Sequence, residues 1–454
     1  MDPTEQLLSL ATQVVESART RGADVAESTA RQGSHLSTKV RLGEPELVEE
    51  AGSRSVGLRV MLGQQVAVSY TSDLTKQGLE RLVEDAIELA RLSQPDAFAG
   101  PPDPSLLSKR SEHPGLEMYD PEMGSLGAGE ALARAKAGED AAFAYDPRIV
   151  NSEGATFTRA AGASALVTSG GFRGGYEGSY ASLVVRPVVD DEGGKKRSGF
   201  HWSARRHLAE LDAPVSVGQE AARRTLRKLG ATKIGTQECP VVFDPDAGRS
   251  ILDLFSGCIM GSSIWRRSSY LVDREGTEVA SALVSVVDDP LIPKAPGSRP
   301  FDGEGLPARR NAVVDGGVLK TYLLDTYSAR KLQRDSTGNA SRGSSGGVGP
   351  STTNFILQRG ATTPEALLAG TKSGLYVTEM MGFGFNAVTG DFSRGASGFW
   401  IENGELGHPV SEVTISLNLD ELLKRIDAVA DDLDLRTSTA TPTFRVSRMT
   451  VAGR

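Results

Sequence analysis

Cysteine is scarce in this sequence. Only Cys239 and Cys258 occur among 454 residues, which excludes a scaffold held by several disulfides. Thiols stay reduced in the cytoplasm, whereas small secreted domains are usually rich in disulfides. We therefore expect a cytoplasmic protein stabilised by packed hydrophobic cores, for which the chain is long enough.

Long apolar runs are also missing. No stretch approaches the roughly 18 consecutive apolar residues of a membrane-spanning helix. The first five residues, Met1 to Glu5, lack the basic start and apolar stretch of a secretory signal. The formal net charge is −8, whereas nucleic-acid-binding proteins are usually basic. We expect neither a membrane nor a nucleic acid among the partners.

Histidine is the third residue type in short supply. A zinc hydrolase needs about three protein ligands, an open position for water and a nearby general base. None of the histidines lies in an H-E-x-x-H or H-E-x-x-x-H arrangement. His201 and His207 are six residues apart, which places them on different faces of a helix or roughly 20 Å apart on a strand. The sequence therefore predicts no zinc site in this chain. The five histidines are His35, His113, His201, His207 and His408.

The remaining composition is that of a globular protein, with 39% hydrophobic and 24% charged residues. Helical and strand-like segments alternate along the chain, which predicts an α+β fold class. We expect an N-terminal α/β-mixed domain with a Pro-rich connector over 1–115 and a middle segment of helices and antiparallel strands over 116–235. A β-rich C-terminal domain is expected over 236–454.

Apolar residues at three- and four-residue steps predict several helices. The helix over 74–92 has Asp73 as its candidate N-cap, and Ser216 with Gln219 fits a capping box for the helix over 217–229. Arg223 and Arg224 on the latter helix are interpreted as a solvated face. The predicted helices also cover 7–18, 125–143 and 419–430, and the predicted strands include 25–31, 36–41, 155–161, 163–168 and 180–189.

One predicted helix follows the strand Pro240 to Phe243. Ile251, Leu252 and Phe255 give it a buried face, and it contains neither histidine nor glutamate between Arg249 and Cys258. Cys258 at its end would need a base and a lowered pKa to act as a nucleophile. No neighbouring residue supplies these, so we interpret Cys258 as a small buried residue.

Four further blocks occur in order after this helix. Together with it they closely resemble the TldD/PmbA family, whose PmbA side is also called TldE and whose members are often named modulators of DNA gyrase. The resemblance implies an N-terminal α+β domain and a β-rich C-terminal domain of the TldD/PmbA type. The blocks are Ser298 to Arg309, Leu323 to Arg330, Gly349 to Asn354 and Gly390 to Gly398.

The same resemblance implies a heterodimer in which only the TldD side is catalytic. In TldD-type members the helix that matches this chain's segment bears two histidines and a glutamate that bind and use zinc, and a late cysteine is a further ligand. This chain has no cysteine after Cys258. It therefore resembles the TldE/PmbA-like subunit, with no catalytic or metal-binding residue of its own. Zinc is then expected on a TldD-like protease partner that degrades or matures unfolded peptides.

Two alternatives remain open at this point. The chain could be a stand-alone hydrolase with non-metal chemistry, using Cys258 or the acidic pair Asp302 and Glu304. It could also be a non-enzymatic, peptide-binding homodimer, since no recognised active site is present.

Five residues are candidates to line a substrate cleft. The carboxyl groups of Asp302 and Glu304 could act as acid and base if their pKa values split, although turn hydrogen bonds and ion pairs are the more common role. Arginines can grip a carboxylate. The candidates are Arg299, Asp302, Glu304, Asn354 and Arg394. A Gly-rich segment over 343–350 lacks the Gly-Lys-Ser/Thr ending of a phosphate loop and is predicted to connect two strands.

Overall fold

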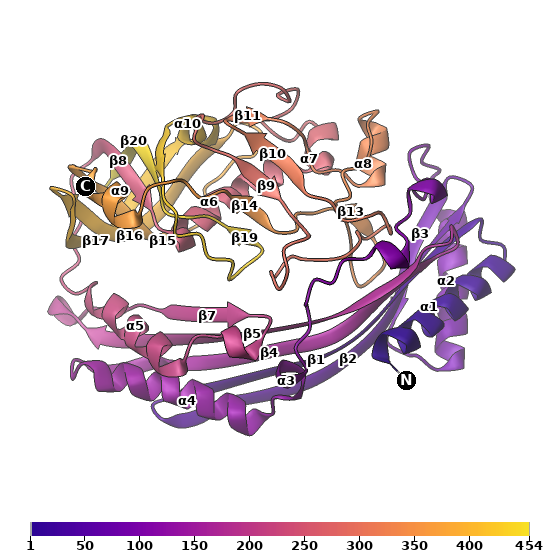
Figure 1. The fold of residues 1–454 in the computed structure, drawn as a ribbon, viewed down its shortest axis with the longest axis horizontal. Helices are drawn as coiled ribbons and strands as arrows, with labels where there is room; N and C mark the ends of the chain where they lie inside the picture. Colours follow the sequence, from indigo (N-terminus) through magenta and orange to yellow (C-terminus); the bar gives the residue numbers. More distant parts are fainter. Residues whose placement is uncertain (1, 454) are drawn as a thin grey trace.

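A long, curved antiparallel sheet forms one half of the molecule (Figure 1). The computed structural model describes residues 2–453. The strand order in this sheet is β3-β2-β1-β4-β5-β6, and β7 also pairs with β5. Its strands are β1 (Val25–Arg41), β2 (Glu44–Leu62), β3 (Gln65–Thr71), β4 (Ile149–Thr168), β5 (Arg173–Asp190), β6 (Lys196–Ser198) and β7 (His201–Arg205).

Helices cover the convex face of this sheet in two groups (Figure 1). Each group has its own hydrophobic core: one joins α1 and α2 to the sheet, and the other joins α4 and α5 to it. The alternating apolar residues of the strands supply the opposing side of each core. The helices are α1 (Pro3–Thr20), α2 (Lys76–Leu92), α3 (Pro121–Ser125), α4 (Ala128–Tyr145) and α5 (Pro214–Leu226).

The long strands differ from the sequence-based expectation. β1 and β4 are each continuous, whereas the sequence predicted two shorter strands in place of each one. The polar and small residues at the middle of β1, Gln32 to His35, lie between the two cores and pair with Ala160 to Ala163 of β4. Pairing on both sides keeps the backbone extended where the apolar pattern is interrupted.

Two helix starts also differ from the prediction. α2 is capped by the Thr75 side chain, which accepts a hydrogen bond from the Gly78 amide, while Asp73 accepts one from Thr75. The capping box for α5 is wrong, because this helix begins earlier, at Pro214, and has no side-chain cap. Proline at a first helical position already has a suitable φ and no amide to satisfy.

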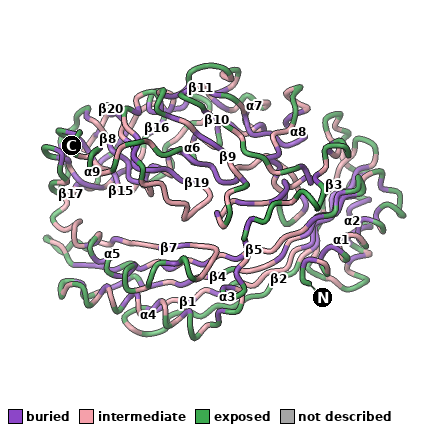
Figure 2. The backbone as a smooth tube through the Cα atoms, in the orientation of Figure 1, coloured by how far each residue is buried: buried purple, intermediate pink, exposed green. Residues whose placement is uncertain are grey.

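The C-terminal half is built on two sheets around the largest hydrophobic core. Their strand orders are β17-β16-β15-β8-β20-β18 and β11-β10-β9-β14-β19, and β12 and β13 form a separate two-stranded sheet. Figure 2 shows buried residues, in purple, in both halves of the molecule. The strands are β8 (Gln237–Phe243), β9 (Val286–Asp288), β10 (Asn311–Asp315), β11 (Val318–Leu319), β12 (Ala340–Arg342), β13 (Val348–Pro350), β14 (Phe355–Leu357), β15 (Ser373–Met381), β16 (Asp391–Glu402), β17 (Glu405–Asn418), β18 (Ile426–Val429), β19 (Thr439–Ala440) and β20 (Phe444–Ala452).

Short helices connect these strands. The helix predicted over 419–430 is wrong in its second half, because α10 ends at Lys424 and β18 follows from Ile426. Ile426 and Val429 pair with Val446 and Phe444 of β20, so sheet pairing overrides the helical pattern there. The helices are α6 (Pro245–Cys258), α7 (Gly261–Trp265), α8 (Thr326–Lys331), α9 (Pro364–Ala369) and α10 (Leu419–Lys424), with single 3₁₀ turns at η1 (Pro104–Leu106), η2 (Arg110–Glu112), η3 (Glu192–Gly194) and η4 (Leu208–Glu210).

A buried ion cluster joins the two halves. Glu27 on β1 accepts hydrogen bonds at Oε2 from Arg342 on β12, at 2.6 Å, and from Arg59 on β2, at 3.1 Å. The side chains of Glu27, Arg342 and Arg59 are 1%, 2% and 9% exposed. Burial alone would raise the pKa of the Glu27 carboxyl, but Arg342 and Arg59 outweigh it and hold that pKa below its ordinary value. This cluster fixes the C-terminal half against the long sheet.

Within residues 2–453, the helices are all too short or too polar to cross a membrane.

Candidate functional site

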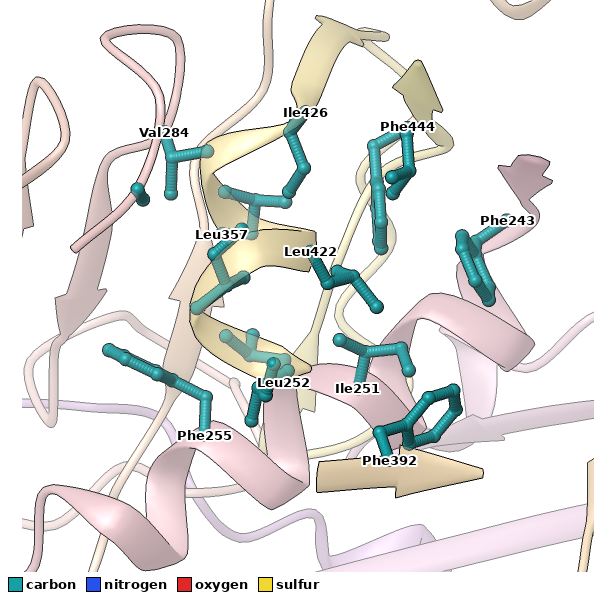
Figure 3. Packing of buried hydrophobic residues seen from close by; sticks show 14 of the residues in the cluster. Phe243, Ile251, Leu252, Phe255, Val284, Leu357, Phe392, Leu422, Ile426 and Phe444 are labelled. Atoms are coloured by element: carbon teal, nitrogen blue, oxygen red, sulfur yellow. The ribbon is translucent and has the colours of Figure 1, made fainter. Parts of the chain in front are cut away.

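Helix α6 lies in the C-terminal half, above the long sheet (Figure 1). Its N-cap Asp244 accepts a hydrogen bond from the Ala247 amide at 2.8 Å, and Pro245 occupies the first helical position. Figure 3 shows Ile251, Leu252 and Phe255 of this helix packed among buried side chains that include Leu422 of α10. The segment Pro245–Cys258 contains neither histidine nor glutamate.

The polar side of α6 is close to β7 of the long sheet. The guanidinium carbon of Arg249 lies 5.9 Å from the ring centroid of Trp202, and that of Arg436 lies 4.9 Å from the same ring. Arg436 also donates to the backbone carbonyl of Trp202 at 3.0 Å. The Tyr180 hydroxyl on β5 donates to the carbonyl of Arg436 at 2.9 Å. These contacts connect α6, the loop before β19 and the concave face of the sheet.

Cations outnumber acids in this region. Asp434 accepts from Arg205 at 3.1 Å and from Arg436 at 2.9 Å. The guanidinium of Arg249 has neither a hydrogen-bond nor a carboxylate partner within residues 2–453, and its Nε is buried. His201 stays neutral at pH 7, because burial, followed by Arg224 and Arg436, lowers its pKa to about 4. A net positive field of this kind attracts anions.

A zinc ion does not fit this place. Zinc takes thiolate, imidazole and carboxylate ligands, usually four in a tetrahedron. The charged residues of α6 are an arginine and the two aspartates Asp246 and Asp253, and Asp246 already lies 3.6 Å from Arg224. Across residues 2–453, no group of three or more histidine, cysteine, aspartate or glutamate side chains is arranged to hold a metal.

A shallow hollow of about 390 Å³ opens on the long sheet beside Tyr180. Small residues form most of its wall, with Gly33 and Ser34 from β1, Ala161 and Gly162 from β4, and Ser179 from β5. Arg206 at its edge donates to the carbonyls of Ala295 and Pro296, which belong to the C-terminal half. The hollow is therefore a concave part of the sheet, lined largely by small side chains, that faces the other half of the chain.

The acidic pair Asp302 and Glu304 is buried and accepts hydrogen bonds from backbone amides. Asp302 accepts backbone hydrogen bonds from Glu304 and Leu306, both at 2.9 Å, and from Ala340 at 3.1 Å. Glu304 accepts from the Thr326 amide at the start of α8, at 2.9 Å. Burial, and then the neighbouring Asp302, raises the pKa of the Glu304 carboxyl to about 8. The interpretation as turn hydrogen bonds is confirmed.

Of the other candidates, Arg299 and Asn354 lie beside this turn. Asn354 is fully buried, accepts from the Gly297 amide at 2.7 Å, and donates to the Asp289 carbonyl and to the Ser298 hydroxyl. Nε and one Nη of Arg299 are buried without a partner in the described chain. Arg394 lies apart from these residues, on β16. The structure thus brings four of the five candidates together, and their contact with a substrate stays a prediction.

Both cysteines are buried, and neither is set up as a nucleophile. Burial raises the pKa of the Cys258 thiol to about 12 and that of the Cys239 thiol to about 11. The interpretation of Cys258 as a buried helical residue is confirmed. The Gly-rich segment does connect two strands, because β12 and β13 form an antiparallel pair around it.

Sequence reasoning missed the residues that line the space between α6 and the sheet. Trp202, Arg249 and Arg436 are spread over more than 200 positions of the sequence, and no local spacing relates them. Arg224 was expected on a solvated face but contacts Glu220 at 2.8 Å and faces Asp246 of α6.

Comparison with known proteins places these features in a family. Sequence models of PmbA/TldA metallopeptidases match three parts of the chain: domain 1 at residues 29–90, the central domain at 122–229 and the C-terminal domain at 236–453. A metalloprotease PmbA homologue from Haemophilus influenzae is 35% identical over 449 residues, which cover 99% of this chain and 97% of that protein. A metalloprotease TldD homologue from the same organism is 24% identical over 393 residues, covering 84% and 80%.

Solved structures agree with this assignment. A Bacteroides thetaiotaomicron protein described as a candidate modulator of DNA gyrase superposes with a TM-score of 0.91, at 28% identity, over 98% of each chain. TldE from Thermococcus kodakarensis superposes with a TM-score of 0.87 over 98% of this chain and 100% of its own; at 21% identity this is a likeness of fold alone. The chain therefore belongs to the PmbA/TldD family.

Proposed function

We propose that this chain is the metal-free, PmbA/TldE-type subunit of a heterodimeric peptidase. A TldD-type partner supplies the zinc site, and the pair degrades or matures unfolded peptides in the cytoplasm. The principal observation is α6, which presents Arg249 and two aspartates but no histidine or glutamate. A helix without imidazole cannot supply the ligands and general base of a zinc peptidase.

The surroundings of α6 support the same proposal. Arg205 and Arg436 share one carboxylate, that of Asp434, and Arg249 lies against the Trp202 ring without a carboxylate partner in residues 2–453, so a divalent cation would be repelled. The degree of similarity points the same way. The chain is 35% identical to a PmbA homologue and 24% identical to a TldD homologue of one organism.

The concave hollow offers a surface for an unfolded peptide. Glycine, alanine and serine line much of it, so an extended backbone can approach the sheet closely. Arg206 at its edge is already fixed by backbone carbonyls. Binding in the hollow would position a peptide between the two halves of this chain, for cleavage by the partner.

The alternative of a stand-alone hydrolase is less well supported. Cys258 is buried with a raised pKa, and Asp302 and Glu304 are engaged by backbone amides. A non-enzymatic, peptide-binding homodimer remains the second candidate, because nothing in the fold of one chain distinguishes the two kinds of pairing.

Reconstitution tests the proposal. The chain is purified alone and together with the TldD-type protein of the same cells, and each sample is given an unstructured, fluorescently labelled peptide. We expect cleavage only by the pair, co-elution of the two chains, and unchanged cleavage when the pair contains the Cys258→Ala variant. Cleavage by this chain alone would contradict the proposal. Elution of this chain as a homodimer that does not bind the TldD-type protein would favour the second candidate.

A further inference from the structure

A second pocket lies at the C-terminal end of α5, next to Asp244 at the N-terminus of α6. It has a volume of about 100 Å³ and is enclosed between α5 and the β15–β16 part of the six-stranded sheet. We call it the α5 pocket; its charged walls are Arg223, Arg224, Arg227, Lys228, Asp244 and Glu379. A neighbouring hollow of about 250 Å³ shares Lys228 and Glu379 with it. A water molecule needs roughly 10–15 Å³ of such space, so the pocket has room for a small organic group.

Three of the four basic residues already have partners. Arg223 donates two hydrogen bonds to Glu220, both at 2.7 Å, and Arg224 donates to the same carboxylate at 2.8 Å. Lys228 forms an ion pair with Glu379. Basic residues in the last turn of a helix also offset the helix dipole, which accounts for their presence without any ligand.

Arg227 differs from these three. Its guanidinium carbon lies 4.5 Å from the ring centroid of Phe399, and within residues 2–453 it has neither a carboxylate nor a hydrogen-bond partner. Burial, followed by the proximity of Arg223, lowers the pKa of Arg227. A half-buried guanidinium without a counter-ion raises the free energy of the folded state. The charge has lost part of its hydration, and in exchange it contacts only the face of an aromatic ring.

The other residues that line the α5 pocket limit which kind of ligand could be the counter-ion of Arg227. Phe200, Phe399 and Tyr376 give the pocket apolar and aromatic sides. Glu379 is already paired, and Asp244 is buried with a pKa raised to about 8, first by burial and then by Asp246. Arg223 and Arg224 share the Glu220 carboxylate, and Arg224 also lies 3.6 Å from Asp246. Glu220, Asp246 and Glu379 thus offset three of the four cations, and one further negative charge balances Arg227. A phosphate dianion would add a second negative charge beside Glu379.

We propose that the α5 pocket binds a carboxylate monoanion carried on an apolar or aromatic body, with Arg227 as its counter-ion. The planar guanidinium can hold both oxygens of a carboxylate while it stacks on Phe399. The source is either a free organic acid or the C-terminal carboxylate of a peptide, because the two share this chemistry. The proposal does not depend on the subunit having a protease partner.

Calorimetric titration of the purified chain tests this. The probes are benzoate, a short peptide ending in phenylalanine with a free carboxylate, and the same peptide with a C-terminal amide. We expect saturable binding of benzoate, of the free-acid peptide or of both, and no binding of the amide. Inorganic phosphate should not displace a bound probe. Binding of the amide as tight as that of the acid, or no binding of either acid, would overturn the proposal.

Variants at Arg227 separate binding from folding. Arg227→Met should weaken binding at least tenfold, and Arg227→Lys, which keeps the charge but loses the planar fork, should weaken it about threefold or more. Arg148→Gln removes an arginine that is 62% exposed and pairs with Asp146 at 2.8 Å, and it should bind like the wild type. Unchanged affinity in Arg227→Lys and in a folded Arg227→Met variant would contradict a role for this residue.

Discussion

Replacing Glu27 by glutamine should loosen the contact between the two halves of the molecule. The carboxylate is the counter-ion of both Arg342 and Arg59, at 2.6 and 3.1 Å, and all three side chains are buried. The amide of glutamine has nearly the same size but no charge. Glu27→Gln therefore leaves two buried guanidinium groups without a counter-ion.

The magnitude follows from this geometry. At a separation of about 3 Å and an effective dielectric constant of about 20, each attraction is roughly 5 kcal/mol, and desolvation offsets much of that. Loss of one partner from a buried pair typically costs about 3–5 kcal/mol. Arg342 keeps hydrogen bonds to the carbonyls of Gly303 and Gly346, so we expect a loss near the lower value, about 3 kcal/mol.

Denaturant unfolding, followed by both circular dichroism and tryptophan fluorescence, measures this loss. Two probes are needed because a chain of several domains need not unfold in one step. The control is Glu130→Gln, which breaks an exposed pair with Arg134 on α4 and should cost only about 0.3–0.5 kcal/mol. A Glu27→Gln variant as stable as this control would refute the reasoning.

The pH dependence gives an independent check on the same residue. The pKa of Glu27 lies below its ordinary value of 4.5, so its stabilising effect is complete above that pH and is lost as the pH falls through the lowered pKa. The difference between the wild type and Glu27→Gln should therefore shrink in acid. A difference that stays constant down to the acid unfolding of the protein would contradict the ionised state of Glu27.

Other predictions follow from the buried acid and the buried thiols. The pKa of Glu304 is raised from 4.5 to about 8, so between these values the folded state holds a proton that the unfolded state has released, and stability falls as the pH rises. Glu304→Gln should remove this loss, and its stability relative to the wild type should increase over that range; a flat difference in urea unfolding would count against the raised pKa. Cys239 and Cys258 should react with a thiol reagent only after denaturation, because both are buried with raised pKa values. Rapid labelling of the native chain would show that one of them is accessible.

Local patterns predicted the elements whose apolar residues face one core. α1, α2 and α6 were predicted from three- and four-residue steps, and the structure confirms them. The pattern failed at β18, where Ile426 and Val429 also fit a helix but pair with β20. The apolar pattern also predicted two strands in place of β1. This strand spans two hydrophobic cores, and the residues at its middle belong to neither core.

The candidate site was predicted only in part. The missing histidine and glutamate of α6 could be recognised from the sequence, since they concern one short segment. The arginines around Trp202 could not, because Arg249 and Arg436 come from α6 and the loop before β19, and only folding places them beside β7. For Asp302 and Glu304 the sequence left two roles open; the structure confirms the turn hydrogen bonds, and the role in a substrate cleft stays a prediction.

Zinc content tests the central claim most directly. The chain is purified alone and as a complex with its TldD-type partner, and the metal in each sample is quantified by mass spectrometry after dialysis. The account predicts far less than one zinc per chain for the isolated protein and about one per heterodimer for the complex. One tightly held zinc per chain in the isolated protein, together with peptidase activity, would contradict it.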